Sequence, residues 1–111
     1  MDSILASIKK MLGIEEDYTH FDPELIIFIN AAFGILFQLG VGPKDKPFTI
    51  SDDGAEWSDF LDGTQIETVK TYIFAKVKLQ FDPPTNSAVL SSYKELISEM
   101  EWRCHIDAET P

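Results

Sequence analysis

The chain has 111 residues, 44% of them hydrophobic, and 19 acidic against 9 basic side chains give it a formal charge of −10. This length suits one domain with a core of its own, and so negative a chain repels a phosphate backbone, which disfavours proteins that grip nucleic acid. The one cysteine, Cys104, cannot form an intrachain disulfide, and the N-terminus lacks a basic region followed by an apolar run. We therefore expect residence in a reducing cytoplasm, or in a particle assembled there.

The first predicted element is a short helix that begins after Asp2 or Ser3 and ends at Gly13. Lys9 and Lys10 stand near its C-terminal end, where the helix dipole favours positive charge. Its apolar residues recur at helical spacing and are Ile4, Leu5, Ile8, Met11 and Leu12. The pattern predicts a helix packed along one stripe.

The second predicted helix runs from Asp22 to about Leu39, with Asp22 as its N-cap, Pro23 at its first position and Gly40 as its C-cap. Its apolar side chains point in nearly every direction around the axis, which a helix tolerates in water only when it is enclosed. A domain of this size can scarcely surround a helix completely. We therefore expect another subunit to cover part of it.

The stretch 25–42 is also long and apolar enough to raise the question of a membrane span. Asn30 and Gln38 interrupt it, however, and the residues before it are acidic, with no cluster of Lys or Arg beside it. We expect no membrane helix here.

A long connection, residues 41–63, follows, with a short extended piece near 48–50. Acidic residues accumulate in its second half with no basic residue among them: Asp52, Asp53, Glu56, Asp59 and Asp62. Trp57, Phe60 and Leu61 lie between them as apolar anchors. The pattern predicts an acidic loop pinned to the body by a one-turn helix over 56–61.

The third predicted helix begins at the capping-box spacing of Thr64 and Glu67 and continues to about Phe81. Its main apolar stripe is accompanied by a second apolar patch, Tyr72 with Leu79, on the opposite side, so we expect two sets of neighbours. Three lysines of this helix can cover apolar surface with their stems and meet acidic groups of an adjacent chain: Lys70, Lys76 and Lys78.

Pro83 and Pro84 end this helix and fix the direction in which the chain leaves it. Asn86 or Ser87 then caps a fourth helix, whose stripe is Val89, Leu90, Tyr93, Leu96, Ile97, Met100 and Cys104. Trp102 lies outside that stripe. It either contacts a partner or lies with its indole across a loop of the same chain. From about residue 104 we expect a tail that is mobile or held by a partner.

These elements predict a single all-α domain over residues 1–111, a small bundle of about four helices with a long acidic loop between the second and third. No motif assigns catalytic roles to Cys104, His20 or His105, and His20 with Asp22 makes a weak zinc signal. Residues 51–56 lack the ligand pattern of a calcium loop, and no glycine-rich phosphate loop follows a strand. We expect no enzyme activity and no cofactor.

Several strings stand in a characteristic order along the chain: Ile29-Asn30, Gln38-Leu-Gly-Val-Gly-Pro43, Trp57-Ser-Asp-Phe60, Val69-Lys-Thr-Tyr72, Phe81-Asp-Pro-Pro84 and Glu99-Met-Glu-Trp-Arg103. In order and spacing they resemble the head-tail connector (adaptor) proteins of long-tailed bacteriophages and prophages. The resemblance implies a structural virion protein of the neck that forms a ring, commonly dodecameric, beneath the portal vertex. Such a ring carries the tail-side connector (stopper) or tail completion protein, and genomic DNA passes through its channel without sequence-specific binding.

Under this resemblance we expect the acidic loop to face the channel or the tail-side partner. Five residues are the expected contacts between subunits: Ile27, Phe28, Tyr72, Lys76 and Leu79. Four are the expected contacts to the portal: Trp102, Arg103, His105 and Ile106. Pro83 and Pro84 are expected to act as a rigid corner between the third and fourth helices. A small angular error between these helices repeats at every subunit of a ring, so a fixed corner helps the ring to close.

Two other classes of function stay open at this point. A small acidic interaction module would mimic DNA or inhibit a host protein, and it would act as a monomer or dimer that competes with DNA for a basic partner. A membrane-disrupting phage protein would use residues 25–42 instead. The acidic loop itself is either an ordinary solvated surface or a charged surface that faces DNA without holding it.

Overall fold

The computed structural model describes residues 3–43, 45–60 and 66–109, with side chains described up to residue 106 in the last range. These ranges contain five helices and no strand: α1 (Ile4–Leu12), α2 (Asp22–Gln38), α3 (Trp57–Phe60), α4 (Ile66–Phe81) and α5 (Ser87–Glu109). One isolated antiparallel bridge joins Ser3 to Glu56. The predicted all-α bundle is confirmed, and α3 is the predicted one-turn helix of the acidic loop.

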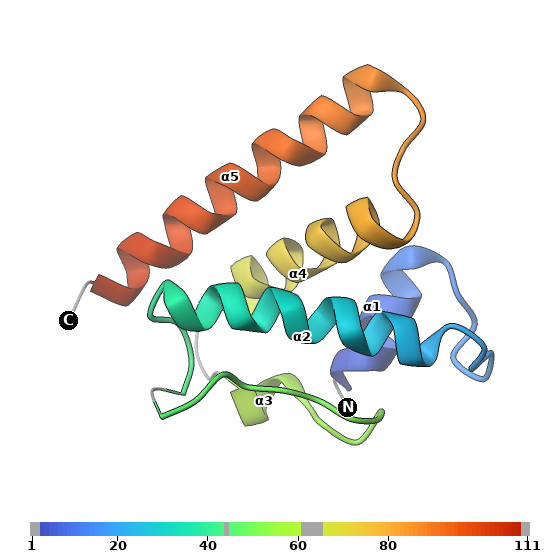
Figure 1. Ribbon diagram of the computed structural model, residues 1–111, viewed down its shortest axis with the longest axis horizontal. Helices are drawn as coiled ribbons and strands as arrows, with labels where there is room; N and C mark the ends of the chain where they lie inside the picture. Colours follow the sequence, from blue (N-terminus) through green and yellow to red (C-terminus); the bar gives the residue numbers. More distant parts are fainter. Residues whose placement is uncertain (1–2, 44, 61–65, 110–111) are drawn as a thin grey trace.

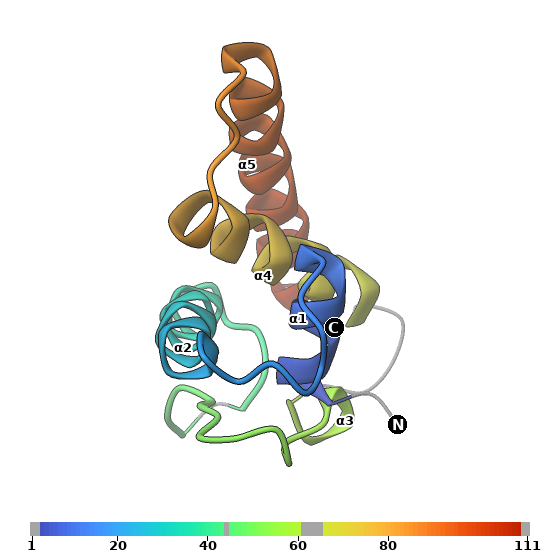
Figure 2. The same ribbon diagram turned by 90° about the vertical axis from the view of Figure 1, so that its right-hand side faces the viewer.

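Helix α4 lies at the centre of the molecule (Figure 1). Turning the view shows α1 and α2 on one side of α4, separated from each other across its width, and α5 rising from the other side (Figure 2). Val69, Tyr72 and Ile73 of α4 are completely buried as a result. The core of the protein therefore surrounds α4.

Both ends of α1 follow the sequence prediction. The Ser3 hydroxyl accepts a hydrogen bond from the Ala6 amide at 3.2 Å, which satisfies one of the free N–H groups of the first turn. Gly13 has a left-handed conformation with φ +81°, and its amide donates to the Lys10 carbonyl. Ile4, Leu5 and Ile8 turn into the core.

A buried ion pair joins α1 to the start of α2. Lys9 is only 2% exposed, and its ammonium lies 3.0 Å from the Asp22 carboxylate and donates to the Glu16 carbonyl at 2.8 Å. The facing oxygen of Asp22 has no well-aligned hydrogen bond, so we assign the attraction mainly to charge. The prediction of Asp22 as N-cap was wrong: Phe21 holds that position without a side-chain bond, because the carboxylate of Asp22 faces the buried cation.

The chain itself covers much of the apolar circumference of α2. The Asn30 side chain donates to the Ile50 carbonyl at 3.0 Å and accepts from the Ile50 amide at 2.8 Å. The rings of Phe48 and Phe60 pack on Phe33 with centroid separations of 5.1 and 4.6 Å. The connection after α2 therefore does much of the enclosing that the sequence analysis assigned to another subunit.

Helix α5 packs mainly on α4 through its C-terminal half, where Ile97, Met100 and Cys104 are buried. Its first turns stand away from the body next to the connection after α4 (Figure 1). The helix extends to Glu109, past the residues in which the sequence shows an apolar period. Helical geometry continues there because the buried thiol of Cys104 still holds the helix against the core.

We expect Gly42→Ala to lower the free energy of unfolding by about 1–3 kcal/mol. Gly42 has φ +87°, and a Cβ added there would lie 2.8 Å from Cζ of the buried Phe60 ring. Denaturant unfolding followed by circular dichroism measures the change. Gly54→Ala is the control, since Gly54 has no positive φ and faces only the side chain of Asp52; an equal loss in both variants would contradict this account.

The stability of the protein should also depend on alkaline pH, through Tyr72. Burial, together with the hydrogen bond to Glu101, raises the pKa of Tyr72 well above its ordinary value. Above about pH 10 the unfolded chain therefore loses a proton that the folded chain keeps, and the free energy of unfolding falls as pH rises. Melting temperatures measured between about pH 9 and 11 should fall less steeply in Tyr72→Phe than in the natural protein; parallel curves would rule this out.

Candidate functional site

The acidic loop, residues 51–62, is fastened to α1 over the part that the structure describes. The Ser3 hydroxyl donates to the Asp53 carbonyl at 2.8 Å, and the Ile4 amide donates to the Ala55 carbonyl at 2.9 Å. Trp57 is buried, and its indole N–H donates to the Ser7 hydroxyl at 3.2 Å. The start of α1 therefore holds the loop through two backbone carbonyls and through the buried Trp57 side chain.

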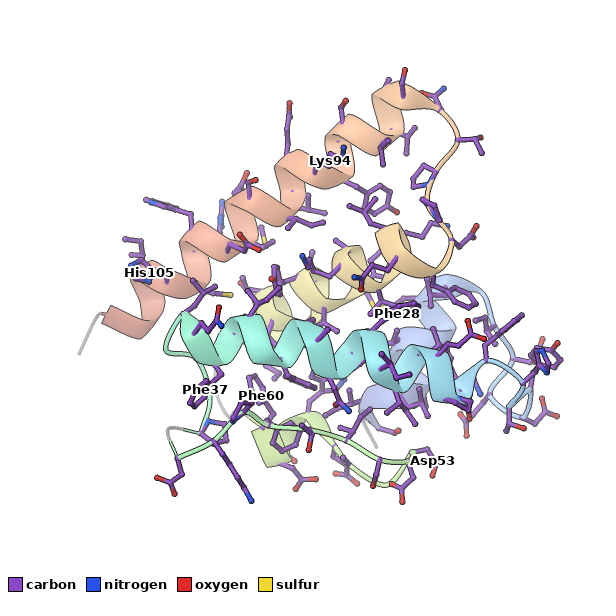
Figure 3. The ribbon with its side chains drawn as sticks, viewed as in Figure 1. Phe28, Phe37, Asp53, Phe60, Lys94 and His105 are labelled. Carbon is purple, nitrogen blue, oxygen red and sulfur yellow. The ribbon has the colours of Figure 1, made fainter. Side chains whose placement is uncertain are left out.

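The carboxylates of this loop lie on its outer side. Asp52, Asp53 and Asp59 are exposed and Glu56 is half-buried, and Figure 3 shows Asp53 pointing away from the body. Asp52 accepts from the Gly54 amide at 2.8 Å, and Asp59 accepts from the Glu56 amide at 2.9 Å. Asp62 lies outside the described residues. Local hydrogen bonds therefore hold two of these negative charges in fixed positions.

The five expected subunit contacts differ in their exposure. Ile27 is 64% exposed, and Phe28, Lys76 and Leu79 are half-buried. Tyr72 is fully buried, and its hydroxyl donates to the Glu101 carboxylate at 2.9 Å. The expectation of Tyr72 at a subunit interface was wrong, because α5 covers the second face of α4 within the same chain.

The four expected portal contacts all lie on the C-terminal part of α5. Trp102 is 63% exposed, and Arg103, His105 and Ile106 are also exposed. Figure 3 places His105 at the end of the molecule away from the corner between α4 and α5. The Arg103 guanidinium lies 2.8 Å from the Glu99 carboxylate one turn earlier. Trp102 thus offers a large aromatic surface beside a paired charge.

Pro83 and Pro84 lie in the non-helical connection between α4 and α5, as expected. The Asp82 carboxylate, directly before the two prolines, lies 3.0 Å from the Lys78 ammonium. The Asn86 side chain accepts from the amides of Ala88 and Val89 at 2.8 and 3.2 Å, so Asn86 caps α5. A charged pair at one end and a cap at the other define this corner.

The structure also contains a surface hollow of about 710 Å³ between α1 and α4, which the sequence analysis did not predict. Its lining combines apolar and small side chains with charges of both signs, and consists of Ala6, Ser7, Lys10, Met11, Gly13, Ile14, Glu15, Glu16, Glu67, Lys70 and Thr71. The lining comes from two segments, residues 6–16 and 67–71, which lie more than fifty positions apart in the sequence. No local sequence pattern could therefore indicate the hollow.

The sequence analysis also missed the Lys9–Asp22 pair, although a signal was present. Lys9 follows Leu5 by four residues, so it falls on the buried side of α1. A lysine on a buried face needs a partner of opposite charge, and the acidic segment after α1 supplies it.

Neither a metal centre nor a membrane span emerges from the described ranges. Within residues 3–43, 45–60 and 66–109, no three His, Cys, Asp or Glu side chains are grouped so that they could hold a metal ion. In the same ranges, no helix has both the length and the apolar character to cross a membrane.

A family model described as phage connector protein matches residues 4–111, which is nearly the whole chain. No curated protein and no solved structure matches it. The chain therefore belongs to the phage connector protein family.

Proposed function

We propose that this connector forms a ring, dodecameric in our expectation, beneath the portal vertex, where it joins the DNA-filled head to the tail-side connector or tail completion protein. The match to the connector family over residues 4–111 is the observation that carries the proposal. The exposed apolar residues support it, since Ile27 of α2 and Trp102 of α5 lie on different elements and can serve different partners. The role is structural, with no bond made or broken.

The acidic loop is proposed to face the DNA channel or the tail-side partner. Asp52, Asp53 and Asp59 are exposed on a backbone that is hydrogen-bonded to α1, so their charges stay in one place as DNA passes. Fixed negative charge repels the phosphate backbone, which keeps the polyanion from adhering to the wall.

The end of α5 is proposed to contact the portal. A large aromatic side chain beside an arginine is the composition typical of residues that dominate binding energy at protein interfaces. Trp102 and Arg103 have this composition, and His105 and Ile106 extend the same exposed region by another turn. In this arrangement the rigid corner at Pro83 and Pro84 sets the angle at which α5 meets the portal.

The ring itself is tested by mixing the purified protein with portal-containing heads that lack connectors and examining the vertex by electron microscopy. A ring of added density at the vertex is expected. Bare portals at saturating protein concentration would reject the connector role that we propose.

Removing the charges of the acidic loop should change DNA release and leave assembly intact. Asp52→Asn, Asp53→Asn and Asp59→Asn together keep the hydrogen-bond acceptors but remove three charges from each subunit. We expect slower ejection from reconstituted particles at low salt, with the difference shrinking as salt screens the wall.

The matched control removes three exposed carboxylates elsewhere, through Asp17→Asn, Asp45→Asn and Glu95→Gln. This variant has the same net charge per subunit as the loop variant. Identical ejection kinetics in the two variants would show that the loop does not line the channel.

Trp102→Ala should weaken binding to the portal by about 1–3 kcal/mol, the range of an aromatic residue at the centre of an interface. Val89→Ala is the control, since Val89 is also exposed on α5 but lies near the opposite end of the helix. Titration of portal-containing heads with each variant measures the two affinities. Equal affinities of the two variants for the portal would show that Trp102 does not contribute to the portal contact.

A further inference from the structure

We propose that the hollow between α1 and α4 of one copy receives the outer strip of α2 of a second copy, so that neighbouring copies join head to tail. The outer strip is defined as Glu24, Ile27 and Ala31, three exposed residues spaced about one turn apart on α2. This contact rests on the ring proposed above and identifies its two complementary surfaces.

In the outer strip, one large side chain protrudes next to small residues that leave the helix backbone uncovered. Ile27 is the most exposed large hydrophobic residue of the described chain, and Ala31 on the following turn is small. Beyond them, a Cβ added at Gly34 would meet no atom within 4 Å. A neighbouring molecule can therefore approach the backbone of α2 closely beside Ile27.

The hollow has the converse shape. Ala6, Ser7 and Gly13 leave space in its lining, and Met11 stands at its edge with 45% of its surface exposed. With Ile14 half-buried in the lining, the hollow offers apolar contact to an entering isoleucine. The flexible Met11 side chain of the copy with the hollow can in turn lie over the small Ala31 side chain of the second copy.

The charges favour one orientation of this contact. Glu24 lies one turn before Ile27, and Lys10 is the exposed cation of the hollow. The other lysine there, Lys70, already lies 3.5 Å from Glu67 and 5.7 Å from the Trp57 ring centre. Glu15 and Glu16 also line the hollow and repel Glu24, so Glu24 is placed on the Lys10 side.

The two surfaces are carried by different helices, the outer strip by α2 and the hollow by α1 and α4. In Figure 2, α2 lies to the left below α4 and α1 to the right. No residue belongs to both the outer strip and the hollow, so one copy can use both surfaces at once. A contact between two different surfaces is heterologous, and it generates a ring when the rotation between copies closes.

Disulfide trapping between two cysteine variants tests the contact, even where it is weak in solution. Ile27→Cys chains are mixed with Met11→Cys chains under mild oxidation, and the heterodimer is quantified by gel electrophoresis and mass spectrometry. A disulfide needs the two Cα atoms within about 7 Å, so we expect at least about tenfold more heterodimer than in the control. The control mixes Ile27→Cys with Val89→Cys, because Val89, at 43%, is exposed to nearly the same extent as Met11.

A reciprocal charge change then tests the orientation. Adding Glu24→Lys to the Ile27→Cys chain, or Lys10→Glu to the Met11→Cys chain, should reduce trapping severalfold, and combining the two reversed chains should restore it. Restoration cannot arise from misfolding of either variant. Its absence would overturn the placement of Glu24 beside Lys10.

The outcomes separate this contact from the connector role itself. Equal trapping with Met11→Cys and Val89→Cys overturns the contact, whatever the portal does. If the natural protein still adds ring density to portals in that case, the connector role stands and other surfaces join the copies. If trapping is selective but portals stay bare, the contact stands and the proposed placement beneath the portal fails.

Discussion

The enclosure of α4 is the constraint on which the rest of the structure depends. Its side chains pack against three neighbours, α1, α2 and α5, and each of these helices buries part of its apolar face against α4. Helix α5 shows this dependence most clearly, since it packs mainly on α4 and its first turns lie beside no other element. The hydrogen bond from Tyr72 to Glu101 adds a directed contact to this packing, because a buried hydroxyl without a partner would be costly.

A second requirement is the placement of charge in a chain with a net charge of −10. Most acidic side chains of the described residues are exposed to water, on connections and helices alike, and the loop between α2 and α4 is fixed through backbone groups and buried Trp57. An exception is the pair of Lys9 and Asp22, in which Lys9 and the facing oxygen of Asp22 are buried. A buried ion pair is a poor source of net stability but tolerates few alternative partners, so it fixes how α1, the following loop and α2 meet.

Local chemistry made most of the elements predictable, and contacts between distant residues caused the errors. Ser3, Gly13 and Asn86 act as predicted because a cap depends on its own helix end. Asp22 has a side chain typical of an N-cap, yet a cation from another helix takes its carboxylate. Tyr72 was assigned to a subunit interface because a helical wheel shows two apolar faces but cannot tell which neighbour covers the second. The extent of α5 beyond residue 104 was missed because the last turns have no apolar period.

The sequence by itself determined the all-α class, the approximate helix positions, the acidic character of the long connection and the resemblance to phage connectors. All of these depend on residue spacing, charge and order along the chain. Only the tertiary structure decided which apolar residues remain exposed, how the acidic loop is fastened to α1, and that α1 and α4 enclose a hollow. The physical reason is that exposure depends on which segments meet in space, and the meeting of α1 with residues 53–57 and with α4 involves positions about fifty or more residues apart.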